Sequence, residues 1–188
     1  SLDLRNTVQW MTSLGVRVIN HSVSWSWVGP GDGTSPYSDA PVYSVDAAVN
    51  NGATWTNSAG NAARATWSGP FADLEGNGVL NFVAGAELNG VSLQGGRLFI
   101  AQARWEDTWT ASARDLDLYL VDGALNVVAR SENFQSGAGG QTPYERLSFI
   151  PDLSGTYYLA ITRYSGALPG WVQLQAFSQD TLQYYTLT

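Results

Sequence analysis

The fold is decided by residues 45–61, which read VDAAVNNGATWTNSAGN. Valines recur at helical spacing between residues 42 and 49, so this part predicts an amphipathic helix that ends at Asn51-Gly52. Residues 53–58 predict a strand, which leads directly into the tetrapeptide at residues 58–61. A helix followed within two residues by a strand is typical of an α/β unit, which has its first strand before the helix.

A helix and a strand precede this stretch. Apolar residues at helical spacing predict a helix near the N-terminus, and they are Leu4, Val8, Met11 and Leu14. Gly15 is placed to end this helix, and residues 16–23 predict a strand. Asp39 is a candidate N-cap of the second helix, with Pro41 near its first turn. Strand, helix and strand in this spacing predict a right-handed unit with two parallel strands.

From about residue 68 the helical period gives way to short alternating strands. The strands that this pattern predicts are residues 98–105, 117–121, 126–129, 144–149, 155–162, 171–177 and 182–187. Asp122-Gly123 is a hairpin signal between the second and third of them. We expect an α+β chain overall, with a small α/β segment at residues 1–67 and an antiparallel β-sandwich of jelly-roll type at residues 68–188.

Two stretches of the first segment resemble the subtilisin-like serine peptidases. They are residues 16–24, which read VRVINHSVS, and the helix, strand and tetrapeptide of residues 45–61. The resemblance implies that Asn61 is the side chain of an oxyanion hole, where a neutral amide donates to the charge that develops in the transition state. It also implies that Ser22, Val23, Ser24, Ala59 and Gly60 bind an extended peptide or protein substrate.

The family's other catalytic motifs do not occur in these 188 residues. We find no Asp-Ser/Thr-Gly, no His-Gly-Thr-His and no Gly-Thr-Ser-Met-Ala segment, so we expect a noncatalytic interior piece of a longer, secreted peptidase. His21 is the only histidine, and without a paired nucleophile and a carboxylate it gives no catalytic signal.

The second half resembles the bacterial prepeptidase C-terminal domains. The residues that carry this resemblance are 115–120, which read DLDLYL, and 154–158, which read SGTYY. It implies an accessory β-sandwich that stabilises the peptidase or recruits substrate. The alternative is a carbohydrate- or protein-binding module, because eight tryptophans offer rings that stack on sugars. Trp10, Trp55 and Trp171 are expected in the core, and Trp105 and Trp109 nearer the surface.

Composition excludes several partners. The chain has no lysine and carries a formal net charge of −7, which argues against nucleic acid and against an anionic membrane surface. It has no cysteine, so disulfides, thiolate metal sites and cysteine catalysis are excluded. A parallel sheet left bare on one face would also allow self-association.

Calcium is a candidate ligand at two places. Asp73, Glu75 and Asn77 offer oxygens at alternating positions, as a calcium loop does, with an Asx-type turn as the alternative. Asp115 and Asp117 would lie on one face of a strand and would repel each other unless a cation offsets their charge. Glu106 or Asp107 would complete such a site, and Arg104 or Arg114 would serve in place of a metal.

Overall fold

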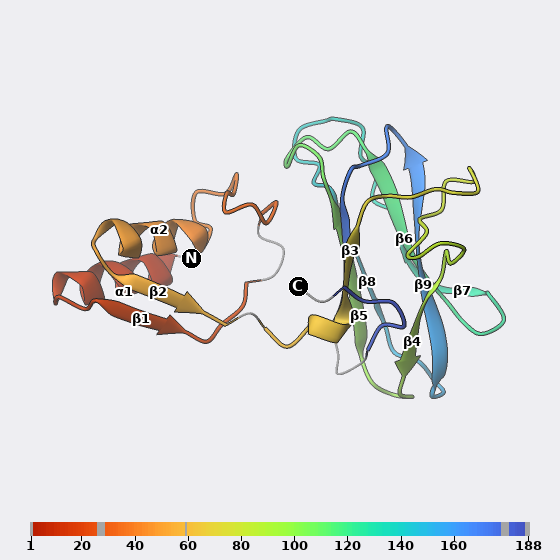
Figure 1. Ribbon diagram of the computed structural model, residues 1–188, viewed down its shortest axis with the longest axis horizontal. Helices are drawn as coiled ribbons and strands as arrows, with labels where there is room; N and C mark the ends of the chain where they lie inside the picture. The colour runs from red at the N-terminus through yellow and green to blue at the C-terminus, as the bar shows by residue number, and fades with distance from the viewer. Residues whose placement is uncertain (1, 26–28, 59, 178–180, 187–188) are drawn as a thin grey trace. The chain divides into compact units, whose positions relative to one another are not determined.

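The computed structural model describes residues 2–25, 29–58, 60–177 and 181–186. The chain divides into two compact units, Ser1–Asn61 and Ala62–Thr188, which are shown in Figure 1. The fold is rich in β-structure, with mostly antiparallel sheets and two α-helices. The expected boundary after residue 67 would cut through strand β3 (Thr66–Gly69), which pairs with a strand of the second unit.

The first unit holds two helices and two parallel strands. In chain order they are α1 (Leu2–Ser13), β1 (Val18–His21), α2 (Val42–Asn50) and β2 (Thr54–Asn57). Val18 pairs with Thr54 and His21 with Asn57, so the two strands end at the same edge. Both strands lie inside the predicted ranges 16–23 and 53–58 and are shorter. Pro41 caps α2 and contributes no side-chain hydrogen bond, so the predicted cap Asp39 lies two residues too early.

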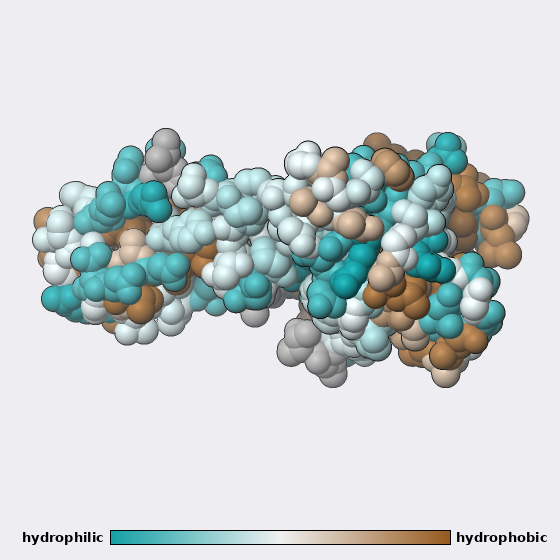
Figure 2. Space-filling view, turned by 90° about the horizontal axis from the view of Figure 1, so that it is seen from above, coloured by the Kyte–Doolittle hydropathy of each residue, from teal (hydrophilic) through white to brown (hydrophobic). Residues whose placement is uncertain are grey.

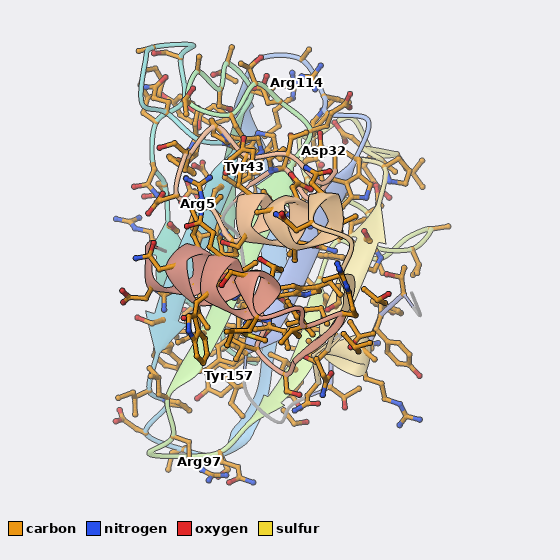
Figure 3. All side chains as sticks on the ribbon, turned by 90° about the vertical axis from the view of Figure 1, so that its left-hand side faces the viewer. Arg5, Asp32, Tyr43, Arg97, Arg114 and Tyr157 are labelled. Atoms are coloured by element: carbon orange, nitrogen blue, oxygen red, sulfur yellow. The ribbon has the colours of Figure 1, made fainter. Side chains whose placement is uncertain are left out.

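The core of the first unit is small. Val8 of α1, Ala48 of α2, Ile19 of β1 and Ala53 form one buried cluster, because both helices cover the same face of the strand pair. Figures 1 and 3 show α1 and α2 lying side by side. On the opposite face of the sheet, Val18 is 67% exposed.

The second unit is an antiparallel β-sandwich that begins with the 3-10 helix η1 (Ala63–Ala65). One sheet has the order β3-β10-β5-β8, and the other β4-β9-β6-β7. The strands after β3 are β4 (Asn89–Leu93), β5 (Phe99–Trp105), β6 (Asp115–Val121), β7 (Val127–Ser131), β8 (Tyr144–Phe149), β9 (Gly155–Ser165) and β10 (Val172–Phe177).

Side chains that alternate along the strands fill the space between the two sheets. Leu116, Leu118 and Leu120 of β6 are fully buried there, whereas the residues between them lie on the other face of the sheet. The predicted hairpin joins β6 to β7, and Asp122 accepts hydrogen bonds from the amides of Ala124 and Asn126 within its turn.

Two strands were missed by the sequence pattern and one predicted strand is wrong. β3 and β4 contain glycine and polar residues, which weaken the strand signal. Over the described part of residues 182–187, Leu182 makes only an isolated bridge with Val91. The backbone of Tyr184 is instead bonded by the Asn89 side chain, whose Nδ2 donates to the Tyr184 carbonyl at 2.8 Å and whose Oδ1 accepts from its amide at 3.0 Å.

The surface mixes polar and apolar side chains. Figure 2 shows the two kinds interspersed on the face in view, with several hydrophobic patches on the sandwich. None of the helices that the structure describes is long and apolar enough to span a membrane.

Candidate functional site

The carboxyl ends of β1 and β2 bring the two predicted parts of the site together. Because the strands are parallel, the chain leaves the sheet at the same edge after His21 and after Asn57. The amide of Ser58 donates to the carbonyl of His21 at 3.2 Å, which continues the parallel ladder past the last strand residue. Ser22, Val23 and Ser24 are exposed beside this ladder, where a ligand can reach them.

Asn57 fixes the geometry of this edge, a role that sequence reasoning missed. Its Nδ2 donates to the carbonyl of Val23 at 3.2 Å and to that of Ser58 at 3.0 Å. Its Oδ1 lies 2.7 Å from Nδ1 of His21. One amide therefore bonds the segments that follow both strands. The only signal in the sequence is an amide side chain at the next-to-last position of a predicted strand.

His21 packs between two tryptophans. Its ring is stacked on Trp25, with centroids 6.4 Å apart, and is tilted against Trp55 at 5.2 Å. The His21 ring is thus in contact with Trp25, Trp55 and the Asn57 amide.

Asn61 and Gly60 lie at the end of the first unit. Both are exposed, and the Asn61 side chain makes no hydrogen bond within the part of the chain that the structure describes. Gly60 has φ +81°, and an added Cβ would meet no atom within 4 Å. The glycine is thus required by backbone conformation and not by lack of space. Ala59, predicted as substrate-binding, lies outside the described residues.

The predicted calcium loop at Asp73, Glu75 and Asn77 is folded as a turn. The two carboxylate oxygens of Asp73 accept from the amides of Asn77 and Gly78, each at 3.0 Å. Asn77 Oδ1 accepts from the amide of Val79 at 3.0 Å. Because these oxygens already cap the turn, the contacts favour the Asx-turn alternative. Within the described ranges no group of three or more acidic or histidine side chains is arranged to hold a metal.

Asp115 and Asp117 lie on one face of β6, as predicted, and both are buried. Burial, followed by the charges of Asp115 and Glu132, raises the pKa of Asp117 to about 6. Burial also raises the pKa of Asp115, although a backbone hydrogen bond from Gln135 opposes it. Tyr119 bridges two of these acids, because its hydroxyl donates to Glu132 Oε1 at 2.6 Å and lies 3.4 Å from Asp117 Oδ2.

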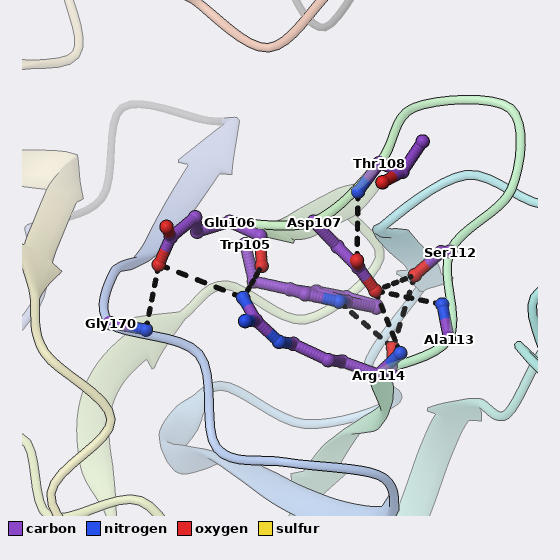
Figure 4. A network of polar contacts seen from close by, with 8 residues as sticks. All are labelled: Trp105, Glu106, Asp107, Thr108, Ser112, Ala113, Arg114 and Gly170. Carbon is purple, nitrogen blue, oxygen red and sulfur yellow. Dashed lines mark hydrogen bonds and ion pairs between the residues drawn. The ribbon is translucent and has the colours of Figure 1, made fainter.

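The expected partners of those acids are engaged elsewhere. Asp107 closes its own loop by accepting from the amides of Thr108, Ala113 and Arg114 and from the hydroxyl of Ser112, at 2.7–2.9 Å (Figure 4). Burial acts to raise the pKa of Asp107, but these hydrogen bonds outweigh it and lower the pKa.

Glu106 and the arginines also have contacts of their own. Glu106 Oε2 accepts from the amide of Gly170 at 2.9 Å and lies 3.6 Å from Arg114 Nη1, as Figure 4 shows. Arg104 donates to Gln173 at 3.0 Å and lies over the ring of Trp171, 5.3 Å from its centroid. Arg104 and Arg114 thus contact Gln173, Trp171 and Glu106.

Two tryptophan expectations are wrong. Trp105 is 2% exposed because it packs in the core of the sandwich, where its indole nitrogen donates to the carbonyl of Arg114 at 3.0 Å. Trp10 is 63% exposed, because it lies on the outward face of α1. Trp109, Trp55 and Trp171 are half-buried.

The comparisons with known proteins identify a fold and no family. No protein-family model matches the chain, and no curated protein matches it. The CspB protease of Clostridium perfringens is similar in structure, with a TM-score of 0.61 and 11% identity over 98% of this chain. The chain spans 41% of the length of that protease. The pre-peptidase C-terminal domain of a Bacillus anthracis collagenase aligns with 59% of this chain and 86% of its own, at 14% identity and a TM-score of 0.37.

Proposed function

We propose that this chain is a noncatalytic segment of a secreted subtilisin-like serine endopeptidase. The first unit contributes the oxyanion side chain Asn61, and the second is an accessory β-sandwich. The observation that carries the proposal is the shared edge of β1 and β2, which sets His21 and Val23 against Asn57 and Ser58. Subtilisin-like sites need this pairing, because one segment binds the peptide backbone while the other presents a donor to the scissile carbonyl.

The chemistry assigned to each residue follows from its position. An extended substrate pairs with Ser22, Val23 and Ser24, which are exposed and follow the end of β1. The exposed amide of Asn61 donates to the carbonyl oxygen of that substrate. Gly60 lets the chain turn with a positive φ just before this asparagine. The attacking serine and its base come from other segments of the peptidase.

Two further observations support the assignment. The fold is similar to part of a protease, over almost the whole of this chain. In addition, Val18 is exposed on the face of the parallel strand pair that lies opposite the helices, and parallel sheets are usually covered on both faces. We propose that other segments of the peptidase cover this face, and that without them it is the surface through which two copies associate.

A fluorophosphonate probe tests the proposal. It reacts with serines that an adjacent base activates, so we expect no labelling of the 188-residue chain by itself. We expect one labelled serine, outside this chain, in the full-length peptidase. Stoichiometric labelling of any serine among residues 1–188 would contradict the noncatalytic role.

A further inference from the structure

The β-sandwich carries a groove of about 460 Å³ that the peptidase proposal does not use. Segments far apart in the sequence line it: the turn after Asp73, the loop before β4, the middle of β9 and the C-terminal segment. The side chains that matter for binding are Glu75, Asn77, Glu87, Tyr158, Gln183 and Tyr184. This volume lies within the range of sites that bind small ligands or single side chains.

The aromatic side of the groove is held in place by β4. Asn89 is fully buried, and its side chain bonds both the amide and the carbonyl of Tyr184. The amide of Gln183 donates to the carbonyl of Gly90 at 2.7 Å. A Cβ on Gly90 would lie 2.7 Å from Gln183 Oε1 and 3.6 Å from the Tyr158 ring. The missing side chain of Gly90 thus leaves room for both groups.

The lining of the groove also contains two acidic side chains, Glu75 and Glu87. The turn capped by Asp73 positions Asn77, whose Nδ2 donates to Glu87 Oε1 at 2.7 Å and so orients that carboxylate. Glu75 is exposed on the same turn. Among the described residues that line the groove, none is an arginine, and the chain contains no lysine. Two carboxylates therefore face a hollow that no basic side chain of the lining neutralises.

We propose that this groove binds an arginine side chain of a polypeptide partner. A guanidinium group is planar, so it stacks on a tyrosine ring while its N–H groups donate to a carboxylate. Tyr158 and Tyr184 supply rings, and Glu75 and Glu87 supply acceptors, in the lining of one groove. A neutral sugar would also stack on the rings but would carry no positive charge to pair with the two carboxylates. The inference stands independently of the peptidase assignment.

Binding of a fluorescent peptide to the 188-residue chain tests the proposal. The probe is Gly-Arg-Gly-Arg-Gly, and its control has citrulline, a neutral isostere, in place of both arginines. We expect saturable binding of the arginine peptide that weakens with added salt, and at least about tenfold weaker binding of the citrulline peptide.

Substitutions locate the binding to the groove. Glu75→Gln and Glu87→Gln should each weaken binding about fivefold, and Tyr158→Ala about threefold. Asp152→Asn removes the same charge from an exposed turn of the sandwich outside the groove and should leave the affinity unchanged. Glu75→Gln is the decisive variant, because Glu75 does not share the Asn77 hydrogen bond that orients Glu87. Circular dichroism verifies that each variant is folded.

Three results would overturn the proposal. They are equal affinity for the arginine and citrulline peptides, no saturation of the arginine peptide up to millimolar concentration, and an unchanged affinity in the Glu75→Gln variant. Binding of chitohexaose that survives both glutamate substitutions, with no peptide binding, would assign the groove to carbohydrate instead.

Discussion

Nδ1 of His21 lies 2.7 Å from Oδ1 of Asn57, and this contact joins the last residues of β1 and β2. Nδ2 of the same amide donates to two carbonyls, those of Val23 and Ser58, so Oδ1 is left as the acceptor. His21 must therefore carry a hydrogen on Nδ1. The histidine and the asparagine together hold the chain segments that follow β1 and β2, and the first of these contains the proposed substrate-binding residues Ser22, Val23 and Ser24.

This tautomer is open to direct measurement, because His21 is the only histidine. The ¹⁵N ring shifts of the neutral imidazole should show the hydrogen on Nδ1 in the wild type. Asn57→Ala removes the acceptor, so the ring should shift toward the Nε2–H form that is otherwise preferred. Asn50→Ala, at an exposed position of α2, should leave the ring shifts unchanged. A wild-type ring protonated on Nε2 would mean that the Asn57 amide is oriented the other way.

Asp107→Ala should destabilise the β-sandwich. The substitution leaves three amides and one hydroxyl of the loop without their acceptor, and charge-assisted bonds of this kind are the stronger ones. We expect the free energy of unfolding to fall by about 2–3 kcal/mol, measured by urea denaturation at pH 7. The exposed Asp152→Asn is the matched control, with an expected change within about 0.5 kcal/mol. An equally small change for Asp107→Ala would mean that the loop does not depend on this carboxylate.

Asp117 should make the sandwich less stable as pH rises. Its folded pKa of about 6 is above the ordinary value of 3.8, so the folded state binds more protons than the unfolded state between those limits. The free energy of unfolding contributed by this group therefore falls as pH rises from 3.8 to about 6. Asp117→Asn should remove this slope and stabilise the protein at pH 7. If the free energy of unfolding changed with pH in the same way for the wild type and Asp117→Asn across that window, the pKa of Asp117 would not be raised in the folded state.

Asp107 contributes with the opposite sign, because its pKa is lowered. The stability that it provides is present above the ordinary pKa of an aspartate and is lost as pH falls through the folded value. The difference between the wild type and Asp117→Asn removes the Asp107 contribution, since Asp107 titrates in both proteins. It reports the titration of Asp117 together with its coupling to Asp115.

Local patterns predicted the elements that bury regular apolar faces. The helical spacing of Val8 and Met11 anticipated α1, and the alternation of Leu116, Leu118 and Leu120 anticipated β6. β4 was missed because Asn89 and Gly90 resemble turn residues. Their actual roles depend on a segment more than ninety residues later, to which Asn89 is bonded.

The sequence alone could only nominate residues 58–61 as part of a candidate site, and that assignment remains a prediction. The hydrogen bonds of Asn57 depend on the register of two strands that are separated by a helix. Likewise, Asp107 accepts hydrogen bonds from amides of its own loop and does not form a site with Asp115. The direction of those amides is set by the backbone conformation of the loop. Periodicity carries no information on that conformation.

Turnover of the full-length peptidase with Asn61→Ala tests the central claim most directly. In the proposed function, Asn61 donates chiefly to the developing oxyanion, so kcat should fall by about 10²–10³ while KM stays nearly unchanged. That magnitude is the loss seen when subtilisin loses its own oxyanion-hole asparagine, and it is carried over from that enzyme. Asn61→Asp should be worse, because a carboxylate repels the forming charge, and Asn50→Ala should match the wild type. Full activity in the Asn61→Ala variant would remove Asn61 from the active site and contradict the proposed function.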